Sequence, residues 1–290
     1  MKHRLGPLGL VRESLIYLAL IAVGAFMAAP FLWSLLTSLK VDAEIFSNRW
    51  LPTQITLQHY RDMFTVAPFG RYFLNSFVMG GLGVLSNLFF GSLAGYTYAR
   101  LRFSGRQTLF RVQLASMMVP GVVTMIPSYL ILRSFPLTGG NNILGQGGYG
   151  LLNTIWAIVL PGGAGAFAVF FMRQFFLSLP EELAEAARID GCGEFRIFWQ
   201  IYLPLCRPAL ATLGIFTFQA GWNAFLWPMI VLNDPNMSTV QMGLQAFSYN
   251  HRTNYGPLMA ASVVVMLPVL LLFIYAQRYF TLGVAFEGGK

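Results

Sequence analysis

The sequence predicts an all-α, polytopic membrane protein, and three observations support this prediction. Apolar residues make up 56% of the 290 residues and only 10% are charged, whereas a soluble domain carries about 25% charged residues. The apolar residues gather in runs of roughly 20, the length that a helix needs to cross a bilayer. Most charged residues lie in the short segments between these runs. We therefore expect a single transmembrane domain over residues 1–290, in contact with membrane lipid.

Six apolar runs define six expected transmembrane helices. The first is longer than the roughly 7–15 apolar residues of a signal peptide, so we expect it to remain uncleaved. In the second, Gly91 and Gly95 have the spacing that lets helices approach closely in lipid, although membrane helices also tolerate glycine without such contacts. Pro120 and Pro127 in the third require neighbouring helices that satisfy the freed carbonyls. The expected spans cover residues 15–36, 73–94, 109–132, 151–171, 209–232 and 258–275.

The distribution of basic residues predicts the orientation. If the residues before the first span are cytoplasmic, the cytoplasmic segments hold 13 of the 19 Lys and Arg residues and the segments outside the membrane hold 6. An excess of basic residues is typical of cytoplasmic segments. Both termini and the loop 178–206 are then cytoplasmic, and the segment 40–70 is an outer loop with a short helix near 57–64. The net charge of +8 is explained by topology, so no nucleic-acid partner is expected.

Several functions are disfavoured by what the sequence lacks. None of the eleven acidic residues falls in the middle of an expected span, whereas ion-coupled carriers usually place ionisable groups there. No phosphate-binding loop of the Gly-x-x-x-x-Gly-Lys-Ser/Thr type is present, nor any pattern of a nucleophile with its base. The two cysteines and three histidines form no metal-ligand spacing. We expect no catalytic residue, no metal and no cofactor in this chain.

The loop 178–206 holds the largest cluster of carboxylates. Ser178-x-x-Glu181 has the form of a capping box, which predicts that a helix begins at Ser178. Glu and Ala dominate the next residues and favour a helix, which Gly191 is expected to end. A second short helix is expected over about 194–201, broken before Pro204.

Two interpretations of this helix are open on the residues alone. It could be a solvated loop helix with a salt-bridged face formed by Glu181, Glu185 and Arg188. Alternatively, it could dock in the cleft of another protein, because small alanines permit close approach and carboxylates can pair with arginine. The alanines in question are Ala184, Ala186 and Ala187.

The spacing of this loop resembles the cytoplasmic signature of bacterial ABC-importer permease subunits. Glu185-Ala186-Ala187 is followed after three residues by Gly191, and after nine more by Ile201-x-Leu203-Pro204; all fixed positions and both gaps agree. The segments 221–228 and 255–261 are similar to the fifth and sixth helices of the smaller maltose-type permease subunit. The final residues, 285–290, depart from the small-residue ending of that subunit.

The resemblance implies a set of partners and a role for the loop. The partners would be a second homologous permease subunit, two ATP-binding cassette ATPase subunits that use ATP and Mg, and an extracytoplasmic solute-binding protein. The complex would import a sugar or oligosaccharide across a bacterial or archaeal cytoplasmic membrane. The residues assigned to ATPase coupling are Glu182, Glu185, Ala186, Ala187, Arg188, Asp190, Gly191, Ile201, Leu203 and Pro204. Among them, the resemblance makes Glu185 the charged contact, Ala186 and Ala187 the close-packed face and Gly191 the turn.

The substrate path is less clearly marked. Gln219, Trp222 and Asn223 in the fifth span combine planar polar groups with an aromatic face, as sugar sites do, and weaker candidates are Asn75, Asn87 and Asn153. The alternative is that these amides hold helices together in lipid, where an unpaired polar group is costly.

Other functions also remain open. The solute could be a polyol, a glycerol phosphate or a peptide. The chain could also be an ion-coupled carrier or a membrane scaffold. The composition of the outer loop 233–256 permits contact with a binding protein.

Overall fold

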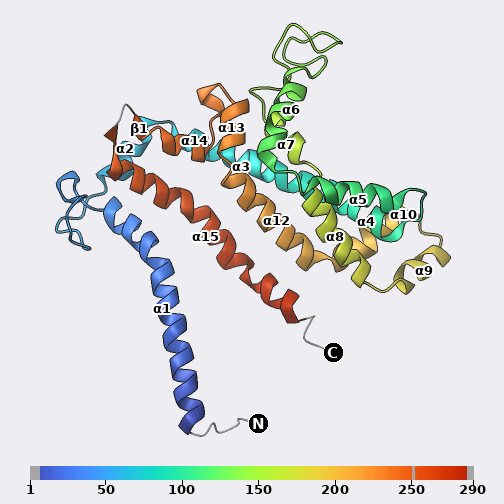
Figure 1. Ribbon diagram of the computed structural model, residues 1–290, viewed down its shortest axis with the longest axis horizontal. Coiled ribbons are helices and arrows are strands. Elements are labelled where there is room, and N and C mark those ends of the chain that lie inside the picture. Colours follow the sequence, from blue (N-terminus) through green and yellow to red (C-terminus); the bar gives the residue numbers. More distant parts are fainter. Residues whose placement is uncertain (1–6, 250–251, 286–290) are drawn as a thin grey trace. The chain divides into compact units, whose positions relative to one another are not determined.

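The computed structural model describes residues 7–249 and 252–285 (Figure 1). Within these residues the fold is all-α as predicted, apart from one short antiparallel hairpin that pairs Ser248 with Thr253. The two chain ends, predicted to be cytoplasmic, lie outside the described residues. The elements are α1 (Pro7–Ser38), η1 (Asp42–Glu44), α2 (Gln58–Val66), α3 (Phe69–Ser86), η2 (Asn87–Gly91), α4 (Ser92–Arg100), α5 (Arg106–Ser116), α6 (Gly121–Arg133), α7 (Trp156–Gly162), α8 (Ala166–Ser178), α9 (Glu182–Ile189), α10 (Glu194–Ile197), η3 (Phe198–Tyr202), α11 (Leu203–Leu205), α12 (Arg207–Trp222), α13 (Leu226–Val231), η4 (Pro235–Met237), α14 (Val240–Gln245), β1 (Ser248–Tyr249), β2 (Arg252–Thr253) and α15 (Tyr255–Ala285).

Three helical segments of the described chain are long and apolar enough to cross a membrane, namely Arg12–Ser38, Phe69–Arg100 and Tyr255–Gln277. Three helix pairs meet the same requirement together, but each pair is bent. The bends are 105° between α5 and α6, 44° between α7 and α8, and 81° between the segment Glu194–Leu205 and α12. If each pair forms one span, the number rises to six. The number of spans therefore remains a prediction.

The predicted third and fifth spans are both interrupted. The predicted third span is interrupted at Pro120, because proline lacks an N–H donor and disfavours helical backbone in the residue before it. Pro127, by contrast, lies inside α6. The predicted fifth span is also divided, since α12 ends at Trp222 and α13 begins at Leu226. Outside the predicted spans, α2 confirms the short helix expected near 57–64.

The described chain forms two compact units, one within residues 1–67 and 244–267 and the other within 68–243 and 268–290. In the second unit, α3, the π-helical turn η2 and α4 form one continuous helix from Phe69 to Arg100. α4 and α8 lie side by side (Figure 1). Of the two interpretations left open for Gly91 and Gly95, the structure shows the close approach, because a Cβ atom there would lie 2.8 Å from the Ala168 side chain and 2.9 Å from the Met172 side chain, respectively.

In the first unit, the end of α1 is tied to the segment that follows it. The hydroxyl groups of Ser38 and Tyr60 lie 2.8 Å apart, which joins α1 to α2. Lys40 is fully buried, donates to the Arg49 carbonyl at 2.6 Å and lies 4.7 Å from the centre of the Trp33 ring. These contacts make 33–60 an ordered part of the unit.

Candidate functional site

The loop between α8 and α12 contains α9, the helix predicted to couple the chain to a partner. α9 begins at Glu182, four residues later than predicted, so the capping box is wrong. Ser178 instead ends α8, and its hydroxyl donates to the Phe175 carbonyl at 2.8 Å. Gly191 ends the helix as predicted: its φ of 79° lies in the left-handed region that favours glycine.

The second helix of the loop extends further than predicted. α10, η3 and α11 run without interruption from Glu194 through Pro204, and the break comes at Cys206. η3 is a π-helical turn. Because proline donates no backbone hydrogen bond, Pro204 is tolerated at the start of the segment that follows this wider turn. The segment Glu194–Leu205 meets α12 at 81°, so it is not a straight continuation of α12.

One face of α9 is packed onto the chain itself. Ala184 and Ala187 are 0% and 5% exposed, and they belong to a core cluster with Phe176, Ile197 and Tyr202. The assignment of Ala187 to a face that packs on a partner is therefore wrong, since small side chains at these positions let α9 lie close to its own core.

The other face of α9 is open. Glu182, Glu185, Ala186, Arg188 and Asp190 are exposed, and so is the apolar Ile189, at 86%. Of the remaining predicted coupling residues, Ile201 and Leu203 pack against the core cluster and Pro204 is exposed. Of the ten predicted residues, seven are therefore exposed, Ile201 and Leu203 are half-buried and Ala187 is buried.

A polar network joins α9 to α4. Arg188 donates from Nε to Glu194 at 2.8 Å, and the Tyr96 hydroxyl of α4 donates to the same carboxylate at 2.8 Å. Arg188 therefore pairs with Glu194 rather than within the predicted face containing Glu181 and Glu185. The hydrogen bond from Arg188 lowers the pKa of the Glu194 carboxyl, and the same contact raises the pKa of Arg188.

Arg100, the last residue of α4, holds the end of α8. Its guanidinium donates to the Phe176 carbonyl at 2.5 Å and to the Leu179 carbonyl, both at the C-terminal end of α8, where a positive charge is favourable. It lies 4.9 Å from the centre of the Tyr202 ring, and the Tyr202 hydroxyl donates to the Pro180 carbonyl at 3.1 Å. α4, α8 and the loop are thus joined at one point.

Reasoning from the sequence missed Tyr96, Arg100, Ile189 and Glu194 as functional candidates. For Tyr96 and Arg100, the sequence signal was their position at the predicted cytoplasmic end of an apolar run. The indication for Ile189 was an apolar residue next to the charged pair Arg188 and Asp190. Nothing local to Glu194 distinguishes it from the other carboxylates, because its partners become visible only in the folded chain.

The network predicts a dependence on pH. The pKa of Glu194 is lowered in the folded chain, so its contact stabilises the protein above its ordinary pKa, and the stabilisation is lost as the pH falls through the lowered value. We expect wild type to melt at a higher temperature than Glu194→Gln at pH 7, and the difference to disappear as the pH falls through the lowered pKa of Glu194. Side-chain exposures of 38% and 41% for Arg188 and Glu194 keep the effect small.

Thermal melting of the purified protein across this pH range measures the difference. Tyr96→Phe is the matched control, since it removes one hydrogen bond to Glu194 but leaves the ion pair with Arg188. It should retain the larger part of the pH dependence, which comes from the hydrogen bond with Arg188, and lose the smaller part that comes from Tyr96 itself. If the difference in melting temperature between wild type and Glu194→Gln stays constant from neutral to acid pH, the ionised carboxylate of Glu194 does not stabilise the folded chain.

The residues predicted for the substrate path do not converge on a cavity. Gln219 and Asn223 are exposed, and Trp222 is buried at 1%, with its ring 4.9 Å from Phe77 and 5.5 Å from Phe73. A cavity of about 440 Å³ in the same unit has other lining residues. It lies among α3, α7 and α12, and its polar lining includes Ser76, Asn87, Thr217 and Thr239.

The three weaker candidates act as helix contacts. Asn87 donates to the Gly162 carbonyl at 2.6 Å and accepts from the Gly165 backbone N–H at 3.2 Å, which holds the break between α7 and α8. Asn75 donates to the Asn236 and Ser238 carbonyls, and Asn153 accepts from the backbone of Asn233 and Asp234. These amides satisfy backbone groups, as the alternative interpretation expected.

Fold and site together define a multi-helix membrane protein that presents a firmly held loop helix with one open face. The chain belongs to the family described as binding-protein-dependent transport system inner membrane component, whose profile matches residues 87–285. It is therefore a permease subunit of the ABC-importer class and a transport component embedded in the inner membrane.

Two relatives and one solved structure are similar over most of the chain. The arabinooligosaccharides transport system permease protein AraQ of Halalkalibacterium halodurans is 36% identical over 272 residues, covering 92% of each chain. The diacetylchitobiose uptake system permease protein NgcG of Streptomyces coelicolor is 34% identical, covering 89% of this chain and 83% of that protein. A bacterial ABC transporter involved in alginate import has the same fold, with a TM-score of 0.80, 23% identity, and coverage of 95% of this chain and 99% of that one.

Proposed function

We propose that this chain forms part of the path by which a sugar or oligosaccharide enters the cell, and that partner ATPase subunits drive it through α9. The two relatives reported above are both named for oligosaccharide transport, which favours a sugar over a polyol, a glycerol phosphate or a peptide. The spacing Glu185-Ala186-Ala187, Gly191 and Ile201-x-Leu203-Pro204 favours ATPase coupling over an ion gradient.

The exposed face of α9 is the observation that carries the proposal. Glu185 offers a carboxylate for pairing with arginine, and Ile189 offers apolar surface that a partner can bury. The opposite face packs through Ala184 and Ala187 on the core cluster that includes Phe176 of α8. Arg188 of α9 is also joined to Tyr96 of α4 through the carboxylate of Glu194. A displacement of a docked α9 would therefore be passed to these helices, and the loop would not absorb it.

The proposal includes the rest of the complex and its orientation. This chain pairs with a second homologous permease subunit and with two ATPase subunits that bind ATP and Mg, and it binds no cofactor itself. Both termini and the loop 178–206 face the cytoplasm, as the basic residues predict. A solute-binding protein delivers the sugar at the other face. Gln219, Trp222 and Asn223 remain a prediction for the path.

Purification from the native membrane, followed by reconstitution in lipid nanodiscs, tests the proposal. We expect the ATPase subunits and a second permease to copurify with this chain. ATP turnover of the complex should rise several-fold when the binding protein is added with an oligosaccharide, and this chain alone should show none. Glycerol phosphate, a polyol and a peptide are the comparison solutes. Solute uptake that continues without any ATPase subunit would overturn the proposal in favour of an ion-coupled carrier.

A further inference from the structure

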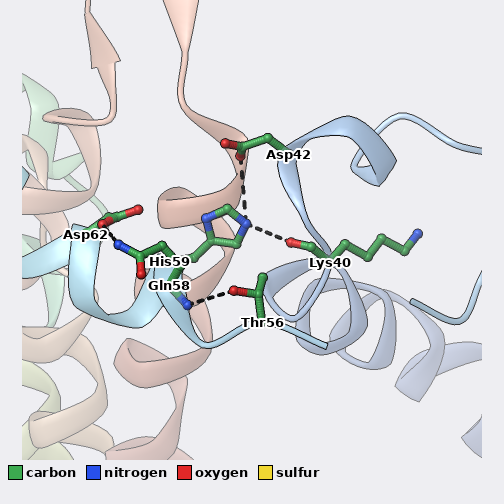
Figure 2. A network of polar contacts seen from close by, with 6 residues as sticks. All are labelled: Lys40, Asp42, Thr56, Gln58, His59 and Asp62. Atoms are coloured by element: carbon green, nitrogen blue, oxygen red, sulfur yellow. Dashed lines mark hydrogen bonds and ion pairs between the residues drawn. The ribbon is translucent and has the colours of Figure 1, made fainter. Parts of the chain in front are cut away.

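A polar pocket of about 460 Å³ lies in the first unit, between the segment after α1, α2 and the beginning of α15. Figure 2 includes the lining residues Asp42, His59 and Asp62, with the two carboxylates on either side of the His59 ring. The remaining lining includes Phe46, Asn254 and Tyr255. None of these residues belongs to the coupling loop or to the predicted substrate path.

His59 lines this pocket and is held in one tautomer. Its side chain is 4% exposed, and its Nε2 lies 2.8 Å from the Lys40 carbonyl oxygen. Because a carbonyl only accepts hydrogen bonds, Nε2 carries the hydrogen and Nδ1 of the neutral ring is an acceptor. Nδ1 is buried and has no hydrogen-bond partner among the residues described. The backbone of Gly256 lies against the ring and keeps it in place.

The charged groups of the pocket are also acceptors. Asp42 is 87% exposed and lies 3.8 Å from Nε2 of His59. Asp62 accepts from the Gln58 amide at 2.7 Å, which leaves its negative charge in place. Over the described side chains, neither carboxylate has an ion pair with lysine or arginine. A ligand that matches this pocket therefore carries a positive charge and several hydrogen-bond donors.

The aromatic lining adds a second constraint. Phe46 is 78% exposed and meets Tyr255 edge to face, with ring centres 5.2 Å apart. Aromatic rings of this kind accommodate the aliphatic stem of lysine or arginine and attract its charged head. A metal ion fits less well, because the described residues contain no group of three or more His, Cys, Asp and Glu side chains that could hold one.

We infer that this pocket receives a lysine or arginine side chain from the extracytoplasmic solute-binding protein. The inference rests on the proposed function and on the predicted orientation, which places residues 40–70 outside. The occupant is a protein side chain because the pocket lies on the face where that protein must dock. Its two carboxylates provide the charge complementarity that steers association and fixes register.

The test uses the full importer in nanodiscs and its purified solute-binding protein as the probe. Binding is measured by surface plasmon resonance at low and high salt for wild type, Asp42→Asn, Asp62→Asn and Asp62→Lys. We expect each asparagine variant to bind about tenfold more weakly, Asp62→Lys to bind about a hundredfold more weakly, and the salt dependence to decrease with each lost charge.

Glu13→Gln is the matched control. It removes one carboxylate charge from an exposed position of α1 on the predicted cytoplasmic side, outside the pocket, and should leave binding unchanged. Unchanged melting temperature and unchanged recovery of the ATPase subunits show that each variant is folded.

The outcomes separate the inference from the function on which it rests. Weaker binding of the probe by the pocket variants, but not by the control, supports the inference. A lysine or arginine of the binding protein is identified as the occupant if its change to glutamate restores binding to Asp62→Lys. If wild type binds the probe but the pocket variants bind equally well with the same salt dependence, the inference is overturned and the function stands. If wild type does not bind the probe at all, the proposed function itself fails.

Discussion

Gly95→Ala is expected to melt at a clearly lower temperature than Gly81→Ala, with a difference equivalent to about 1–3 kcal/mol in the free energy of unfolding. A Cβ atom on Gly95 would lie 2.9 Å from the Met172 Cβ, 3.0 Å from the Arg173 backbone nitrogen and 3.1 Å from the Val169 carbonyl oxygen. Two of these atoms are backbone and cannot turn aside. α4 and α8 must therefore move apart along their contact.

Gly81 isolates the contact from the helix. A Cβ atom there would meet nothing within 4 Å, and Gly81 lies in the same continuous helix as Gly95. Both substitutions gain the helix propensity of alanine over glycine, about 1 kcal/mol, so that gain cancels in the comparison. Thermal melting of the two purified variants in the same detergent measures the difference. Equal melting temperatures would show that close packing of α4 on α8 does not stabilise this protein.

This packing also shows what the sequence alone could and could not predict. The spacing of Gly91 and Gly95 is a local pattern that permitted a close helix contact, but the pattern alone could not distinguish this contact from simple tolerance of glycine in a membrane helix. The apolar runs and the glycine that ends α9 were equally local, so the fold class and the existence of that helix could be predicted. Pro120 was visible as well, but whether a proline bends a span or interrupts it depends on its neighbours in space.

The support beneath α9 could not be predicted, because it joins distant parts of the chain. Tyr96 and Glu194 are 98 residues apart in the sequence, and neither is unusual where it stands. Ala184 and Ala187 were recognised as small, but the pattern did not show whether the chain's own core or a partner covers them. The same ambiguity affected Trp222, whose aromatic face is used within the chain.

The second large effect is expected at the open face of α9. Glu185→Lys should reduce the amount of ATPase subunit that copurifies with this chain at least tenfold, because the change replaces an attraction for arginine with a repulsion. Glu185 is exposed, so the melting temperature of the isolated chain should change little. Loss of assembly without loss of folding is the result that distinguishes a docking contact from a structural one.

Glu13→Lys is the matched control for this experiment. It reverses an exposed carboxylate in α1, on the predicted cytoplasmic side but outside the loop, and should leave assembly unchanged. A compensating change of a basic residue to glutamate in the ATPase subunit should restore assembly to Glu185→Lys. If Glu185→Lys assembles normally and retains sugar-stimulated ATP turnover, Glu185 is not the charged contact of α9, and this part of the proposal is overturned.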